Sequence, residues 1–117
     1  MNTRGLKRMQ RIACKPVSVT AAGTTHEDAF DLDDENLVFA VTNAANAGVC
    51  LPKAVPGKII MIKVVSNAIL AVYNYHDDGA YINLVAAETA YSMAAYTTAI
   101  FFCTSATQWY TLPLVAS

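Results

Sequence analysis

Two histidines are the side chains of this sequence best suited to acid–base or metal chemistry, and each stands beside acidic residues. His26 is followed by Glu27 and Asp28, and His76 is followed by two aspartates. A catalytic serine or cysteine would have to meet a histidine and a carboxylate in space, and the sequence alone leaves that arrangement open. Neither a nucleophile-elbow motif nor an HExxH motif is present. We therefore expect solvated turn histidines and predict no catalytic residue and no enzymatic activity.

An acidic cluster follows the first histidine. Asp31, Asp33 and Glu35 have the alternating spacing that opens a calcium-binding loop. Such a loop also needs glycine at its sixth position and a bidentate acid at its twelfth, where this sequence has Asn36 and Thr42. The alternatives are a solvated loop and an acidic interface that meets a basic partner. The candidate interface residues are Glu27, Asp28, Asp31, Asp33, Asp34 and Glu35.

The three cysteines, Cys14, Cys50 and Cys103, are odd in number and widely spaced. This pattern indicates neither a disulfide framework nor a paired-cysteine metal site. Cys50 and Cys103 stand in apolar runs, so we expect buried thiols that pack as small hydrophobic side chains. The five glycines form no phosphate-binding motif. The sequence therefore predicts no metal and no cofactor.

Charge is divided unevenly between the first 15 residues and the rest. Residues 1–15 hold five of the eight basic residues and none of the nine acidic ones, so this segment carries +5 and residues 16–117 carry −6. A basic segment of this kind can dock on an acidic partner, or it can be a solvated terminus. We expect docking on a protein surface rather than on nucleic acid, because no basic face is expected in the remainder. The arm residues expected to bind the partner are Arg4, Leu6, Lys7, Arg8, Met9, Arg11, Ile12 and Lys15.

The composition favours one domain that is partly buried in an assembly. Hydrophobic residues make up 55% of the 117 and charged residues 15%, whereas soluble domains average about 25% charged residues. The alternative is a monomeric, alanine-rich β domain. No apolar run reaches the length of a membrane span, so we expect no membrane partner. We divide the chain into an N-terminal arm, residues 1–15, and one β domain, residues 16–117.

Short apolar runs separated by turn residues predict an all-β fold. The expected strands are Val17–Ala21, Leu37–Thr42, Val49–Leu51, Lys58–Val65, Ile69–Tyr75, Ala80–Val85, Tyr96–Thr104 and Gln108–Leu114.

Three features of these strands guide the choice of fold. Lys58–Val65 is apolar on both faces, which is typical of a strand covered on both sides. Its spacing from Ile69–Tyr75 predicts a β-hairpin. Only Ala86–Ala95 has a helical composition, and it can equally be a loop. Strands at intervals of about ten residues, without a repeat of solenoid length, predict a single antiparallel β-sandwich or barrel of jelly-roll type.

Three longer motifs resemble a known group of proteins. They are AGTTHEDAFDL at 22–32, the run GVCLPKAVPGKIIMIKVVSNAILAVYNYHDDGAYIN at 48–83, and TTAIFFCTSATQWYTL at 97–112. The sequence resembles small virion-associated proteins of tailed bacteriophages and prophages, over roughly residues 20–112. It departs from their pattern at Val65-Ser66-Asn67, which lacks the usual glycine, and at Tyr73-Asn74, where a proline is usual.

The resemblance implies a non-enzymatic structural protein on the capsid surface of a virion. Such a decoration (cement) protein would bind the major capsid protein of the assembled head, as a homo-oligomer with a trimer favoured. The alternative is a tail-fibre, spike or head-fibre adhesin module that binds host-surface glycan through exposed aromatic residues. In that case Trp109 or Tyr75 would be exposed.

Overall fold

The computed structural model describes residues 16–43, 46–76, 79–84 and 89–116, and these residues contain strands but no helix. The strands are β1 (Val17–Thr20), β2 (Phe30–Asp31), β3 (Val38–Thr42), β4 (Gly48–Cys50), β5 (Ile59–Val64), β6 (Leu70–Tyr73), β7 (Tyr81–Ile82), β8 (Tyr91–Met93), β9 (Thr98–Ser105) and β10 (Gln108–Leu112). The described part of the chain thus offers no helix that could cross a membrane. The arm predicted at residues 1–15 lies outside the described residues.

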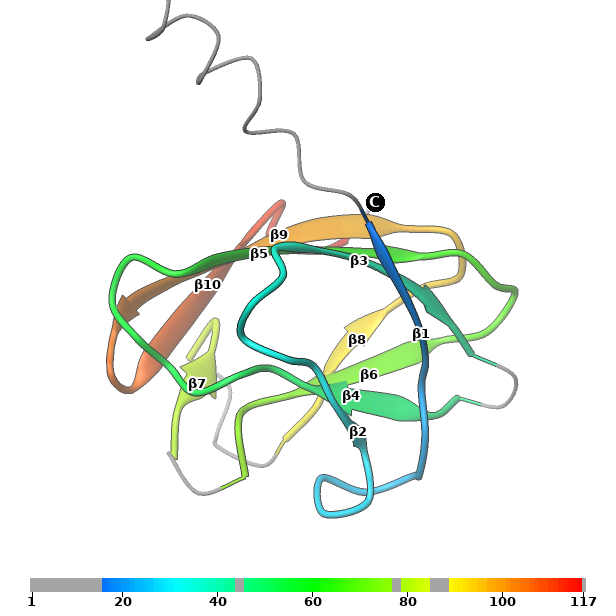
Figure 1. Cartoon of the computed structure of the whole chain (residues 1–117), viewed down its shortest axis with the longest axis horizontal. Coiled ribbons are helices and arrows are strands. Elements are labelled where there is room, and N and C mark those ends of the chain that lie inside the picture. Colours follow the sequence, from blue (N-terminus) through cyan, green and yellow to red (C-terminus); the bar gives the residue numbers. More distant parts are fainter. Residues whose placement is uncertain (1–15, 44–45, 77–78, 85–88, 117) are drawn as a thin grey trace, which may run out of the picture.

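From β1 to β9, successive strands alternate between two sheets. A six-stranded sheet has the order β1-β3-β5-β9-β10-β7, and a four-stranded sheet has the order β2-β4-β6-β8. β1, β3 and β5 are parallel in the first sheet, and β2, β4 and β6 are parallel in the second. Each pair β1–β2, β3–β4 and β5–β6 is therefore one coil, and Figure 1 shows the coils stacked with the two sheets facing each other.

This arrangement is a β-solenoid of stacked coils, so the predicted sandwich or barrel is wrong. The predicted hairpin is wrong for the same reason, because β5 and β6 belong to different sheets. A solenoid period that the sequence analysis did not recognise is visible in the register. Phe39 of β3 lies opposite Ile62 of β5, and Val49 of β4 lies opposite Val72 of β6, each 23 residues later.

The C-terminal third ends the solenoid by reversing the direction of the chain. β8 pairs antiparallel with β6, and β9 pairs antiparallel with β5. β10 then turns back on β9, and the short β7 adds to β10 in parallel. The stretch proposed as helix or loop contains β8, while residues 85–88 lie outside the described residues. The last parallel coil is thus capped by antiparallel strands.

The core lies between the two sheets. On the six-stranded sheet the inward positions include Phe39, Ile62, Phe101 and Trp109, all of them fully buried. On the four-stranded sheet they include Val49, Leu70, Val72 and Met93, which are also fully buried. Apolar side chains that alternate along a strand therefore lie on its inward face, as period-two burial requires.

The loop between β1 and β2 folds over the outer face of the four-stranded sheet. Ala29 of this loop packs on Cys50 and Tyr73, which form a second, smaller apolar cluster. The loop is held by Asp28, whose Oδ1 accepts hydrogen bonds from the backbone N–H and hydroxyl of Thr25, both at 2.8 Å, and from the backbone N–H of Thr24 at 3.1 Å. These bonds, those from Thr25 first, lower the pKa of Asp28.

Gly23 begins this loop and is expected to be intolerant of substitution. Its φ is +71°, and a Cβ there would lie 2.2 Å from Asp28 Oδ1 and 2.5 Å from the Asp28 carbonyl oxygen. We expect Gly23→Ala to lower the free energy of unfolding by about 2–3 kcal/mol, measured by chemical denaturation. Gly79→Ala is the control, because its φ is also positive but nothing lies within 4 Å. That variant should lower the free energy of unfolding by about 1 kcal/mol from backbone strain alone. Equal losses in the two variants would show that contact with Asp28 does not contribute.

Candidate functional site

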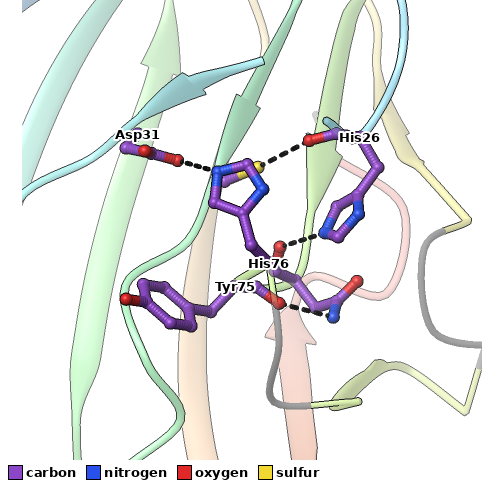
Figure 2. A network of polar contacts seen from close by, with 6 residues as sticks. His26, Asp31, Tyr75 and His76 are labelled. Atoms are coloured by element: carbon purple, nitrogen blue, oxygen red, sulfur yellow. Dashed lines mark hydrogen bonds and ion pairs between the residues drawn. The ribbon is translucent and has the colours of Figure 1, made fainter. Parts of the chain in front are cut away.

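Two histidines and a cysteine meet on the outer side of the four-stranded sheet. His26 comes from the loop that covers this sheet, Cys50 ends β4, and His76 follows β6. One ring nitrogen of each histidine and the Cys50 sulfur all lie within 4.8 Å of one another. Each of the three coils thus contributes one of these side chains, and Figure 2 shows the two rings side by side.

Hydrogen bonds to backbone carbonyls hold the buried members of this cluster. His26 is buried, and its Nε2 lies 3.0 Å from the Asn74 carbonyl oxygen, so that Nε2 carries the proton and donates it. The Cys50 thiol donates to the His26 carbonyl at 3.4 Å. These contacts orient the imidazole and the sulfur before any ligand binds.

A carboxylate orients the second histidine. His76 Nε2 lies 2.5 Å from Asp31 Oδ1, so Nε2 donates to the carboxylate. The two side chains are 28% and 61% exposed, and this side of the cluster therefore opens to solvent. The His26 and His76 ring centroids are 5.2 Å apart. In both histidines Nε2 is the nitrogen that donates to an oxygen acceptor, so Nδ1 is the ring nitrogen that remains to be offered to a ligand.

The electrostatics of the cluster argue against a cysteine nucleophile. Burial, with the nearby Asp31 carboxylate as a second cause, raises the pKa of Cys50 to about 12. The sulfur is therefore a protonated thiol at neutral pH, and a thiol is a poor nucleophile. What the cluster offers chemically is a set of two imidazole nitrogens and one sulfur, which is a donor set for soft or borderline metal ions.

This cluster was not predicted from the sequence. Both histidines were expected in solvated turns, which is wrong for the buried His26, and no metal ligands were predicted. The relevant signal was long-range spacing: His26 and Cys50 are 24 residues apart, of the same order as the separations of 22, 19 and 23 residues between paired positions in adjacent coils. Side chains spaced by one coil length come together in a solenoid, but this spacing carries no meaning in a sandwich.

The predicted acidic interface lies at the surface. Three of its carboxylates make hydrogen bonds within their own region: Asp28, Asp31 and Asp33. Asp33 Oδ1, for example, accepts from the backbone N–H groups of Glu35 and Asn36, both at 3.0 Å. All six side chains of the predicted set are exposed. The whole set is therefore accessible to a partner, although three of its carboxylates also make local hydrogen bonds.

The outer face of the six-stranded sheet carries a continuous apolar surface. Outward positions pair across β5, β9 and β10, with Ile59 opposite Phe102 and Phe102 opposite Tyr110. The next row pairs Met61 with Ile100 and Ile100 with Leu112. We call this the apolar face, and its members are Val38, Ile59, Met61, Ile100, Phe102, Tyr110 and Leu112.

This apolar face is accessible in the described part of the chain. Ile59 is 54% exposed and Leu112 is 64% exposed. The Phe102 and Tyr110 rings lie 6.0 Å apart and form its aromatic centre. Lys63 is the charged residue that borders it, and its ammonium donates to the Tyr96 carbonyl. Contiguous exposed apolar surface of this kind marks interaction sites.

The two aromatic residues on which the adhesin alternative depends differ in exposure. Trp109 is fully buried in the core, whereas Tyr75 is 37% exposed. Trp109 is therefore not accessible to a glycan, and Tyr75 lies next to His76 at the edge of the histidine–cysteine cluster (Figure 2).

The fold and its surfaces define a small β-solenoid with an exposed apolar sheet face. Comparison with protein-family models, with curated proteins and with solved structures found no match to this chain.

Proposed function

We propose that this chain is a structural subunit of a tailed-phage virion that binds the assembled head as a decoration protein. In this proposal it performs no reaction, and it binds both to copies of itself and to the major capsid protein on the capsid surface. The observation that carries the proposal is the apolar face on the outer side of the six-stranded sheet. The resemblance of the sequence to small virion-associated proteins supplies the biological setting.

The apolar face supports contact between copies of the chain. The amino-acid pattern of β5 is that of a strand covered on both sides, yet in the described part of the chain Ile59 is 54% exposed and Met61 is only half-buried. The face carries no formal charge at its centre, so two copies can approach without repulsion. Burying apolar area contributes about 25 cal/mol per Å², and a symmetric oligomer reuses the same contact in every subunit. We favour a trimer whose apolar faces pack around the symmetry axis.

The division of charge supports a second contact, made by the arm. Residues 1–15 carry +5, and the exposed acids Glu27, Asp34 and Glu35 belong to a body of opposite sign. We propose that the arm orders along the capsid protein, where charge pairing and burial of Leu6, Met9 and Ile12 offset the entropic cost of ordering. Because the decoration protein binds only the assembled shell, it stabilises that shell by mass action.

The experiment measures oligomeric state and shell binding in the same set of proteins. Light scattering should give a trimer for the full chain and a monomer for Ile59→Lys/Phe102→Lys, with unchanged circular dichroism. The matched control is Ser18→Lys/Thr42→Lys, which adds the same charge to exposed polar positions of the same sheet and should remain trimeric. A full-length protein that stays monomeric at all concentrations would overturn the self-association.

Shell binding is measured by co-sedimentation with heads that lack the protein. Deleting residues 1–14 should leave the trimer intact and reduce binding below detection, because the arm is the proposed capsid contact. Full occupancy of the shells by the truncated protein would contradict that role.

A further inference from the structure

We propose that His26, Cys50 and His76 form a binding site for one divalent transition-metal ion of the zinc type. Three observations carry the inference: the donor atoms converge, hydrogen bonds preset the histidines, and the three ligands come from three different coils. The site goes beyond the proposed virion function and does not depend on it.

The distances suit a tetrahedral ion after a small adjustment. Zinc binds imidazole nitrogen at about 2.0–2.1 Å and thiolate sulfur at about 2.3 Å, so ligand atoms around it lie about 3.3–3.8 Å apart. One ring nitrogen of each histidine and the Cys50 sulfur lie within 4.8 Å of one another. An approach of about 1 Å is within reach of side-chain rotation, since His76 is partly exposed and follows the end of β6.

Hydrogen bonds place the histidines in the tautomer that a metal requires. His26 donates from Nε2 to the Asn74 carbonyl, and His76 donates from Nε2 to the Asp31 carboxylate. Metal-binding histidines almost always make such a bond with their second nitrogen, which fixes the ring and raises its basicity. Nδ1 of each ring is then the ligand atom, and Asp31 positions His76 without binding the ion itself.

The donor set selects the kind of ion. Two imidazoles and a thiolate suit zinc and cobalt, whereas calcium and magnesium prefer oxygen ligands. Three protein ligands leave a fourth position, which lies toward the solvent-exposed side occupied by His76 and Asp31. Binding replaces the proton on Cys50, and the ion then joins the β1–β2 loop to the ends of β4 and β6.

Cobalt provides the direct test, because a cobalt–thiolate bond produces a charge-transfer absorption that no oxygen ligand gives. The full chain is stripped with a chelator under reducing conditions and titrated with Co²⁺. We expect one equivalent to bind with charge-transfer and tetrahedral d–d bands, and we expect Zn²⁺ to displace it and to raise the melting temperature. Absence of the charge-transfer band in the folded wild-type protein would overturn the proposal.

Variants assign the ligands. Cys50→Ala and His76→Ala should abolish the charge-transfer band and the zinc-induced rise in melting temperature. His76 is partly exposed, so its loss should leave the fold intact. Asp31→Asn should weaken binding about 10-fold without abolishing it, as expected of a positioning residue. Cys14→Ala/Cys103→Ala is the matched control and should bind as the wild type does. Unchanged cobalt spectra in folded His76→Ala and Cys50→Ala would place the ion elsewhere and overturn the assignment.

Discussion

Replacing Trp109 by alanine should lower the free energy of unfolding by about 3–5 kcal/mol, because it removes the largest fully buried side chain. Trp109 points into the core from β10, where it lies opposite Cys103 of β9 and Ile82 of β7. Its carbonyl also accepts from the Asn83 N–H at 2.8 Å, so this strand position ties β7 to the sheet. Small domains have a free energy of unfolding of about 5–15 kcal/mol. If the wild-type value lies at the lower end of this range, the variant should be close to unfolding.

Denaturant titration followed by circular dichroism measures this loss, and thermal unfolding should show a melting temperature lowered by about 10–20 °C. Trp109→Phe is the matched control, since it keeps most of the buried ring and should lose only about 1–2 kcal/mol. A Trp109→Ala protein as stable as the Phe variant would show that this position is not the centre of the core.

Asn43 should be nearly as sensitive, although its side chain is polar. Asn43 is buried at the end of β3, and its Oδ1 accepts from the Ala47 N–H at 2.8 Å. Its Nδ2 donates to the Ile69 carbonyl of the next coil at 2.5 Å and to the Ala47 carbonyl at 3.2 Å. Removing this amide leaves backbone groups of two coils without these partners, and each such loss costs about 1–3 kcal/mol. We therefore expect Asn43→Ala to lower the free energy of unfolding by about 2–4 kcal/mol in total.

The appropriate comparison for Asn43 is Asn67→Ala, the same substitution at an exposed position in a neighbouring loop. That change should alter stability by less than about 0.5 kcal/mol in the same denaturation experiment. If the two alanine variants unfold at the same denaturant concentration, the coil-to-coil bonds of Asn43 contribute little.

The sequence predicted the strands better than the way they are joined. Val38–Thr42, Ile59–Val64 and Gln108–Leu112 lie within the ranges expected from alternation, because period-two burial is a property of a single strand. Alternation does not say whether the next strand lies beside its predecessor or across the core from it. The spacing therefore predicted a hairpin turn between β5 and β6, whereas this loop carries the chain to the opposite sheet.

The candidate sites were predictable to different degrees. Two sequence features indicated extra buried surface of the kind that the apolar face could provide: the two-sided hydrophobicity of Lys58–Val65 and the low content of charged residues. The histidine–cysteine cluster was not, because proximity of His26, Cys50 and His76 depends on coil stacking and not on short motif spacing. Only the solenoid register gives intervals of 24 and 26 residues a spatial meaning.

The reversal of chain direction at β8 and β9 gives the molecule two unlike ends. At the finishing end, antiparallel strands occupy the edges of the last coil, so no further coil can be added in register there. At the starting end, β1 and β2 have a neighbour on one side only among the described strands. The described part of the molecule therefore has parallel strands at one end of the stack and antiparallel strands at the other, which is a polarity that a closed barrel would lack.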